Sequence, residues 1–120
     1  MLRTVPKRIM TNSATLKAVT ETDRWGNTTY TEYELTRIHV QPTHDVVKNS
    51  TDKNVNLNAV LFYDPRVSSP VVDWSALQSA SDSANGQMKV VYEGKEYTVY
   101  SIDLLPDDEG RLHHVEVLLY

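Results

Sequence analysis

The clearest evidence for the fold of this chain is the sequence QMKVVYEGKEYTVYSIDLLPDDEGRLHHVEVLLY, residues 87–120. Apolar and polar residues alternate over three runs, which is the period-two pattern of half-buried β-strands. Two short segments, Glu93–Lys95 and Pro106–Gly110, interrupt the runs, and each places a glycine where a turn needs a left-handed backbone. The stretch therefore predicts three consecutive strands joined by two turns, with Val115 and Val117 on the core face of the last strand.

A second pair of strands is predicted near the N-terminus. Residues 13–22 alternate, with Leu16 on the apolar side, and a longer run follows the turn-forming segment DRWGN. The two runs predict an antiparallel hairpin with Trp25 near its tip. Because the alternation changes phase within the second run, we expect a bulge or sharp bend near Thr36.

The middle of the chain contains a continuously apolar run. Residues 41–54 are polar and are interpreted as a loop. The following residues, 54–64, alternate at first, with Leu57 on the apolar side, and then become apolar throughout. A strand buried on both faces has this pattern. We therefore expect Val60 and Phe62 at the centre of the core.

Residues 66–86 have no long period. Asp73 is placed to cap the N-terminus of a short helix near 73–81, in which Trp74 falls on the apolar side. The rest of the segment is rich in Ser, Ala and Asp, so it offers little apolar area to offset the cost of ordering its backbone. We expect an insertion that is largely mobile in the isolated protein.

Length and composition agree with one small all-β domain. The chain has 120 residues, of which 40% are hydrophobic and 23% charged, and it has no cysteine. This length suits a single core, and the lack of cysteine excludes disulfides and thiol nucleophiles. The sequence predicts a single domain over residues 1–120: an antiparallel barrel or curled sandwich of about six or seven strands, with long loops and at most the short helix.

The net charge of −4 is unevenly distributed. Residues 1–20 contain four basic and no acidic side chains, so the remaining residues carry eight basic against sixteen acidic groups. An acidic body argues against a dedicated nucleic-acid binder. Arg3, Lys7 and Arg8 lie in a basic N-terminal arm, residues 1–12. This arm is either a solvated tail or a segment that docks on an acidic partner or a phosphate.

Titratable side chains offer weak candidates for catalysis or metal binding. His113 and His114 are neighbours on a strand, so we expect them to point to opposite faces, where they cannot chelate one ion. Asp107, Asp108 and Glu109 are interpreted as a solvated turn. The sequence has neither a nucleophile elbow nor a glycine-rich phosphate loop. We therefore expect a protein that is not an enzyme and uses no metal or cofactor.

Two segments carry motifs that occur together. The first segment, residues 21–42, has the sequence ETDRWGNTTYTEYELTRIHVQP and contains D-x-W-G-N followed by tyrosines. The second segment, residues 90–120, has the sequence VVYEGKEYTVYSIDLLPDDEGRLHHVEVLLY and contains G-K-E-Y-x-V, a turn and H-x-E-V. In this order they resemble the minor capsid and head-tail joining proteins of long-tailed double-stranded DNA bacteriophages, also called head-closure or connector proteins. The resemblance covers roughly half of the chain, and residues 67–88 match no pattern of that family.

The resemblance implies a head-tail connector subunit, assembled as a ring beneath the portal protein and sharing the portal's twelvefold symmetry. DNA would pass through the ring without sequence-specific binding, and an acidic body is compatible with this because a basic lumen would hold phosphates. Candidates for contacts with the portal and with neighbouring connector or tail proteins are Arg3, Lys7, Arg8 and Trp25. Candidates for a loop facing the lumen or the next ring are Asp73, Trp74 and Asp82.

Several alternatives stay open. Trp25 is either an exposed interface residue or folds back onto the sheet. The protein itself is alternatively a tail-completion subunit, or a monomeric all-β module that holds a small ligand or peptide in the mouth of a barrel. No run of the sequence reaches the apolar length that crosses a bilayer, so we expect no membrane contact. The expected location is the head-tail interface of the virion, after assembly in the host cytoplasm.

Overall fold

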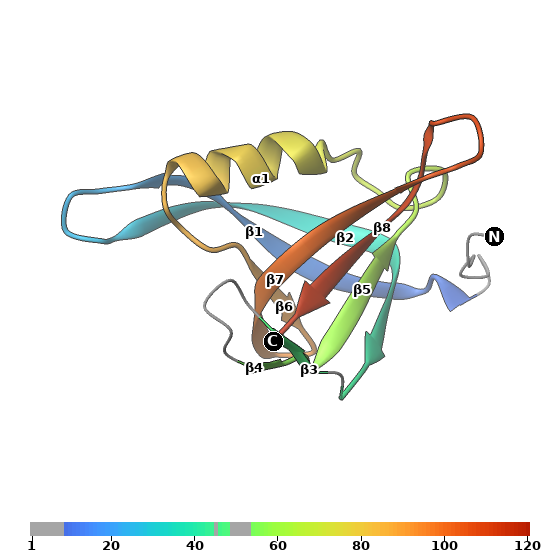
Figure 1. Cartoon of the computed structure of the whole chain (residues 1–120), viewed down its shortest axis with the longest axis horizontal. Helices are drawn as coiled ribbons and strands as arrows, with labels where there is room; N and C mark the ends of the chain where they lie inside the picture. The colour runs from blue at the N-terminus through green and yellow to red at the C-terminus, as the bar shows by residue number, and fades with distance from the viewer. Residues whose placement is uncertain (1–8, 45, 49–53) are drawn as a thin grey trace.

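Six strands close into a barrel in the order β1-β2-β5-β8-β7-β6, each antiparallel to its neighbours (Figure 1). They are β1 (Asn12–Thr22), β2 (Thr28–Pro42), β5 (Ala59–Tyr63), β6 (Lys89–Tyr92), β7 (Lys95–Pro106) and β8 (Leu112–Leu119). The computed structural model describes residues 9–44, 46–48 and 54–120. The all-β fold predicted from the sequence is confirmed, whereas Arg3, Lys7 and Arg8 lie outside the described residues.

β1 and β2 form the predicted hairpin. They pair from Asn12 opposite Ile38 to Thr22 opposite Thr28. The register shifts at Arg37, whose φ of 55° lies in the left-handed region. This bulge lies one residue beyond the predicted position, and beyond it the end of β2 pairs with β5. The bulge therefore marks the place where the pairing of β2 passes from β1 to β5.

The barrel is filled by side chains from all six of its strands. Of the residues expected in the core, Leu16, Val115 and Val117 are completely buried and Leu57 is almost so. They are joined by fully buried side chains from other parts of the barrel, among them Leu35, Ile38, Leu61, Val90 and Leu119.

The expectation for Val60 and Phe62 is wrong. β5 alternates: Ala59, Leu61 and Tyr63 are buried, whereas Val60 and Phe62 are only half-buried. The reason is topological, because a strand in a closed barrel has one face toward the core and one face outward. Phe62 lies on the outer face and stacks on the ring of His39 at 5.9 Å. A continuous apolar run thus belongs here to a strand with a single core face.

The helix predicted near 73–81 is present as α1 (Trp74–Ser83). The Asp73 side chain caps it by accepting a 3.1 Å hydrogen bond from the backbone N–H of Ala76. The helix lies against β1 (Figure 1). Just beyond its end the chain passes closely over the same strand: a Cβ on Gly86 would lie 3.0 Å from a methyl of Val19. The mobility expected for residues 66–86 stays a prediction.

A small second sheet occupies part of the stretch that was interpreted as a loop. β3 (Val46–Lys48) and β4 (Asn54–Asn56) pair antiparallel, with Val47 opposite Val55. The loop interpretation of residues 41–54 is therefore wrong at β3, whereas β4 lies in the stretch 54–64 that was predicted as a strand. Valine is among the residues that favour extended backbone, and the polar residues around these valines hid that preference.

Candidate functional site

Two hairpins extend away from the barrel in different directions, and both end in the same kind of turn (Figure 1). The β1–β2 hairpin ends in DRWGN and the β7–β8 hairpin in DDEGR, so each turn has the pattern D-x-x-G-x. In the first, one carboxylate oxygen of Asp23 accepts 2.9 Å hydrogen bonds from the backbone N–H groups of Trp25 and Asn27. Gly26 supplies the left-handed conformation at φ 87°.

The second turn repeats these contacts. Asp107 accepts 2.9 Å hydrogen bonds from the backbone N–H groups of Glu109 and Arg111, and Gly110 has φ 82°. The backbone hydrogen bond from Arg111 lowers the pKa of Asp107, as the one from Asn27 lowers the pKa of Asp23. In both turns an ionised aspartate holds the loop, so the two residues after it are free to face outward.

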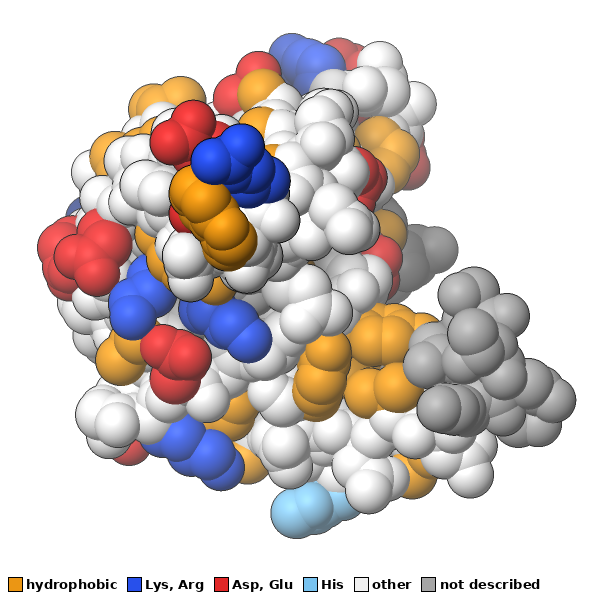
Figure 2. Space-filling view, turned by 90° about the vertical axis from the view of Figure 1, so that its left-hand side faces the viewer, with side chains coloured by type: hydrophobic (Ala, Val, Ile, Leu, Met, Phe, Trp, Pro, Cys, Tyr) orange, Lys and Arg blue, Asp and Glu red, His pale blue; other side chains and the backbone are white. Residues whose placement is uncertain are grey.

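The tip of the β1–β2 hairpin presents an aromatic and a basic side chain. Trp25 is 72% exposed, and the guanidinium carbon of Arg24 lies 4.3 Å from the centroid of its ring. The tryptophan therefore stands out from the sheet and does not fold back onto it. Figure 2 views the molecule from this side: apolar, basic and acidic side chains are interspersed over the face, without a broad field of one charge.

The tip of the β7–β8 hairpin is different in character. Its outward residues are Asp108 and Glu109, and Arg111 pairs with Glu109 and with Asp107. Leu104 and Leu112, which flank this turn on β7 and β8, are both 41% exposed. The two projecting hairpins thus share the backbone geometry of their turns but differ in their side chains. The β1–β2 tip is aromatic and basic, whereas the β7–β8 tip is acidic.

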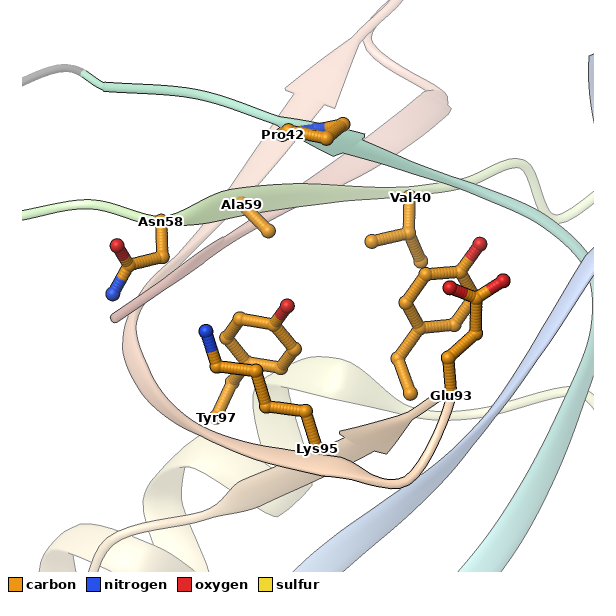
Figure 3. A pocket seen from close by; sticks show the side chains of 8 residues that line it. Val40, Pro42, Asn58, Ala59, Glu93, Lys95 and Tyr97 are labelled. Atoms are coloured by element: carbon orange, nitrogen blue, oxygen red, sulfur yellow. The ribbon is translucent and has the colours of Figure 1, made fainter.

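A cavity of about 310 Å³ opens at one end of the barrel, where the β6–β7 turn approaches the ends of β2 and β5 (Figure 3). Figure 3 shows Val40 and Ala59 pointing into it from these two strands, opposite Tyr97 and Lys95 of the hairpin. We call it the barrel-mouth pocket. Its lining residues are Val40, Pro42, Asn58, Ala59, Tyr92, Glu93, Lys95 and Tyr97.

The pocket combines an apolar floor with a charged rim. Val40 and Ala59 are buried, whereas Glu93 and Lys95 are exposed. The Lys95 ammonium lies 5.0 Å from the ring centroid of Tyr97. Burial raises the pKa of Tyr92, and the negative charge of Glu93 and a hydrogen bond to it raise this pKa further. The arrangement suits an aromatic or apolar group that carries a positive charge beside it.

The three candidates for a lumen-facing loop have different environments. Asp73 is engaged as the helix cap, and Asp82 is exposed and accepts a 3.0 Å hydrogen bond from the Gln78 side chain. Trp74 is 2% exposed and packs edge-on against Tyr63, with ring centroids 5.3 Å apart. The expectation that Trp74 faces a lumen or a partner is therefore wrong, because its ring belongs to the core.

The histidine pair also differs from expectation. The Nδ1 atoms of His113 and His114 lie 2.8 Å apart, so the neighbouring rings turn toward each other across the strand edge. The prediction that they point apart is wrong, because the β7–β8 register shifts at His113: Leu105 pairs with His114 and Pro106 with Leu112, and this irregularity interrupts the alternation. Among the residues that the structure describes, no three His, Cys, Asp or Glu side chains gather as metal ligands would.

Sequence reasoning singled out Trp25, which the structure shows to be exposed, and missed the barrel-mouth pocket. The repeated D-x-x-G spacing was a usable signal for two equivalent turns. The pocket gave no comparable signal, because its residues come from β2, the start of β5 and the β6–β7 hairpin. Only the closure of the barrel brings these segments together.

The comparisons with known proteins identify a family. A family model described as "Minor capsid protein" matches residues 6–119, almost the whole chain. No curated protein matches it. Within the described ranges, no helix is long and apolar enough to span a membrane. The match covers both projecting hairpins, the barrel and α1, so the chain belongs to the family of phage minor capsid proteins and is a structural component associated with the virion.

Proposed function

We propose that this minor capsid protein is a subunit of the head-tail connector of a tailed phage. In this proposal several copies form a ring under the portal protein, and DNA passes through the ring without sequence-specific binding. The copies number twelve, matching the portal, and the basic arm with Arg3, Lys7 and Arg8 docks on an acidic surface of a neighbouring protein. The protein has no catalytic role.

The observation that carries the proposal is the exposed Trp25 at the end of a hairpin that projects from a closed barrel. Large aromatic side chains are enriched in protein interfaces and are costly to leave in water. Trp25 is 72% exposed and is therefore available to a neighbour. A connector subunit must contact neighbours on several sides, and two hairpins projecting in different directions support this.

The charge distribution supports the proposal in a second way. Beyond residue 20 the chain carries twice as many acidic as basic side chains. A channel wall of this kind does not gain the counterion release that holds basic proteins on DNA. DNA can then slide past the subunits, as packaging and ejection require.

In vitro complementation tests the proposal. A phage whose gene for this chain is inactivated should produce DNA-filled heads and complete tails that do not join. Its lysate should regain infectivity when mixed with purified heads from a normal infection, or with the purified protein, but not with purified tails. Electron microscopy of the rescued particles should show a ring of this protein at the neck.

Other outcomes identify the alternatives. Rescue by purified tails but not by heads would assign the protein to tail completion. Normal infectious particles without the protein would contradict any joining role and would favour an accessory binding module. Native mass spectrometry should show a monomer or weak oligomer for the free chain and a ring in the presence of portal complexes.

A further inference from the structure

We propose that Trp25 of one subunit inserts into the barrel-mouth pocket of the next copy, with Arg24 beside Glu93. The contact is head-to-tail, because the inserting tip and the receiving pocket are different parts of the same surface. This inference rests on the proposed ring, since it names the residues through which neighbouring copies meet.

The positions of tip and pocket favour a contact between copies. The turn that bears Trp25 precedes the first residue of β2, whereas Val40 and Pro42 of the pocket lie at the other end of that strand. An extended strand advances about 3.3 Å per residue, so the two sites are up to roughly 40 Å apart. The longest dimension of the molecule is 44 Å. Trp25 is 72% exposed and thus does not occupy the pocket of its own chain, so tip and pocket are each available to another copy.

A contact of this type has a defined consequence for assembly. Because the two patches differ, every bound copy still offers one free tip and one free pocket. Repetition of a heterologous contact yields a closed ring when the rotation between copies completes a circle. The proposed insertion is thus a contact that generates rings rather than isolated dimers.

The size and lining of the pocket suit an indole ring. Its volume of about 310 Å³ lies at the lower end of the range for ligand sites, and so it suits one aromatic side chain better than a large cofactor. Val40 and Ala59 provide an apolar floor, and Tyr97 provides an aromatic wall. The Lys95 ammonium already lies over the Tyr97 ring, where it can also contact the face of an inserted indole, the ring that binds cations best.

Charge complementarity fixes which copy-to-copy orientation is favoured. The Arg24 guanidinium lies against the Trp25 ring, so the two side chains enter the site together. Glu93, at the rim, is exposed and supplies the opposite charge. An arginine paired with a carboxylate beside a buried aromatic is a common combination in strong protein contacts.

Cysteine cross-linking in assembled particles tests the contact directly. The natural chain has no cysteine, so in the Arg24→Cys, Glu93→Cys double variant a disulfide between copies can form only through the engineered residues, and each single variant shows what homotypic pairs contribute. Oxidised particles should yield a ladder of covalently linked chains that a reductant collapses to monomer. The matched control is Asp108→Cys with Glu93→Cys, because Asp108 occupies the position of Arg24 in the equivalent turn. This control should give no ladder.

Charge reversal provides the second measurement. Arg24→Glu and Glu93→Arg should each lower incorporation into particles at least about tenfold, and the double variant should restore it. Trp25→Ala should lower incorporation at least as much, while the melting temperature of the free chain stays unchanged. Asp103→Arg, a charge reversal at an exposed residue of β7 outside both tips, should leave incorporation unaffected.

The results separate this inference from the proposed function. One combination of results is a ring at the neck of the rescued particles, while the cysteine variant gives no ladder and the double charge reversal does not restore incorporation. That combination overturns the Trp25 contact and leaves the connector function standing. If the cysteine variant gives a ladder but purified tails, and not heads, restore infectivity in the complementation experiment, the Trp25 contact is supported and the placement on the head side is overturned. If the cysteine variants fail to enter particles, oxidation of the concentrated free chain against the same control decides the contact.

Discussion

The hydroxyl of Ser68 donates a 2.7 Å hydrogen bond to the backbone carbonyl of Arg37, the residue that forms the bulge in β2. The same hydroxyl accepts a 3.0 Å hydrogen bond from the backbone N–H of Asp64. Next to it, Ser69 and Thr36 exchange two backbone hydrogen bonds. The segment after β5 therefore holds the point at which the pairing of β2 passes from β1 to β5.

Ser68→Ala should destabilise the protein by about 1–3 kcal/mol, because it leaves the carbonyl of Arg37 and the buried N–H of Asp64 without their shared partner. Ser13→Ala is the control, since Ser13 is an exposed serine on β1. Its unfolding free energy should change by no more than about 0.5 kcal/mol. Urea unfolding measures both. Equal effects of the two substitutions would show that the Ser68 bridge does not hold the bulge.

Leu61→Ala should cost about 2–5 kcal/mol of stability, because Leu61 is completely buried in the barrel. Phe62→Ala, one residue along the same strand, should cost only about 1–2 kcal/mol, because its ring lies half-buried on the outer face. Thermal or urea unfolding of the two variants compares the faces of β5. A larger loss of stability for Phe62→Ala than for Leu61→Ala would show that Phe62 lies on the core face and would contradict the orientation of β5.

Trp74→Ala should destabilise the protein by about 3–5 kcal/mol, since the ring is buried and packs edge-on against Tyr63 at the end of β5. Trp74→Phe should cost less than Trp74→Ala, because a phenyl ring fills more of the site than a methyl group does. The indole N–H has no hydrogen-bond partner among the described residues, and a phenyl ring removes this buried donor. Hydrogen exchange of residues 74–83 should be fast in the alanine variant and slow in the phenylalanine variant. Fast exchange in the natural chain would instead support a mobile insertion.

Stability should fall in acid partly because of Asp64. Burial alone raises the pKa of this carboxyl, but hydrogen bonds from the side chain and backbone of Arg66, and its positive charge, bring the pKa below the ordinary 3.8. A carboxyl whose pKa is lower in the folded state than in the unfolded state stabilises the fold at pH values above its ordinary pKa. This contribution is lost as the pH falls below 3.8 through the folded-state value.

Asp64→Asn should therefore be less stable than the natural chain at neutral pH and should lose less stability on acidification. The measurement is the unfolding free energy at a series of pH values from about 7 to about 2.5. Asp108→Asn is the control, because Asp108 is an exposed carboxyl on the β7–β8 tip, and its pH profile should follow that of the natural chain. Parallel profiles for Asp64→Asn and the natural chain would rule out the Asp64–Arg66 pair as a source of acid sensitivity.

Local signals predicted much of this fold. The glycine turns and alternating runs indicated both hairpins, the phase change indicated the bulge at Arg37, and Asp73 indicated the start of α1. Each of these features depends on residues close together in the chain. Such features can be read without knowing what packs where.

The errors arose where distant segments decide the outcome. A run of apolar residues does not show how many faces of β5 are covered, and only barrel closure leaves Phe62 outside. The composition of the segment around Trp74 does not show that the ring of Tyr63, on β5, packs against the ring of Trp74. The barrel-mouth pocket exists only because the β6–β7 turn approaches β2 and β5. These are tertiary relationships, to which neighbouring residues give no guide.

The twin D-x-x-G-x turns have a consequence for how this protein can be altered. In each, Asp and Gly set the backbone, so the two side chains between them can be exchanged without reshaping the hairpin. A chain with the Arg24 and Trp25 side chains moved to the β7–β8 tip, and the acidic pair moved to the β1–β2 tip, should keep its fold and change its choice of neighbour. The choice of neighbour then depends on the two residues between Asp and Gly in each turn. Substitutions there can direct the subunit to a different neighbour without altering the barrel.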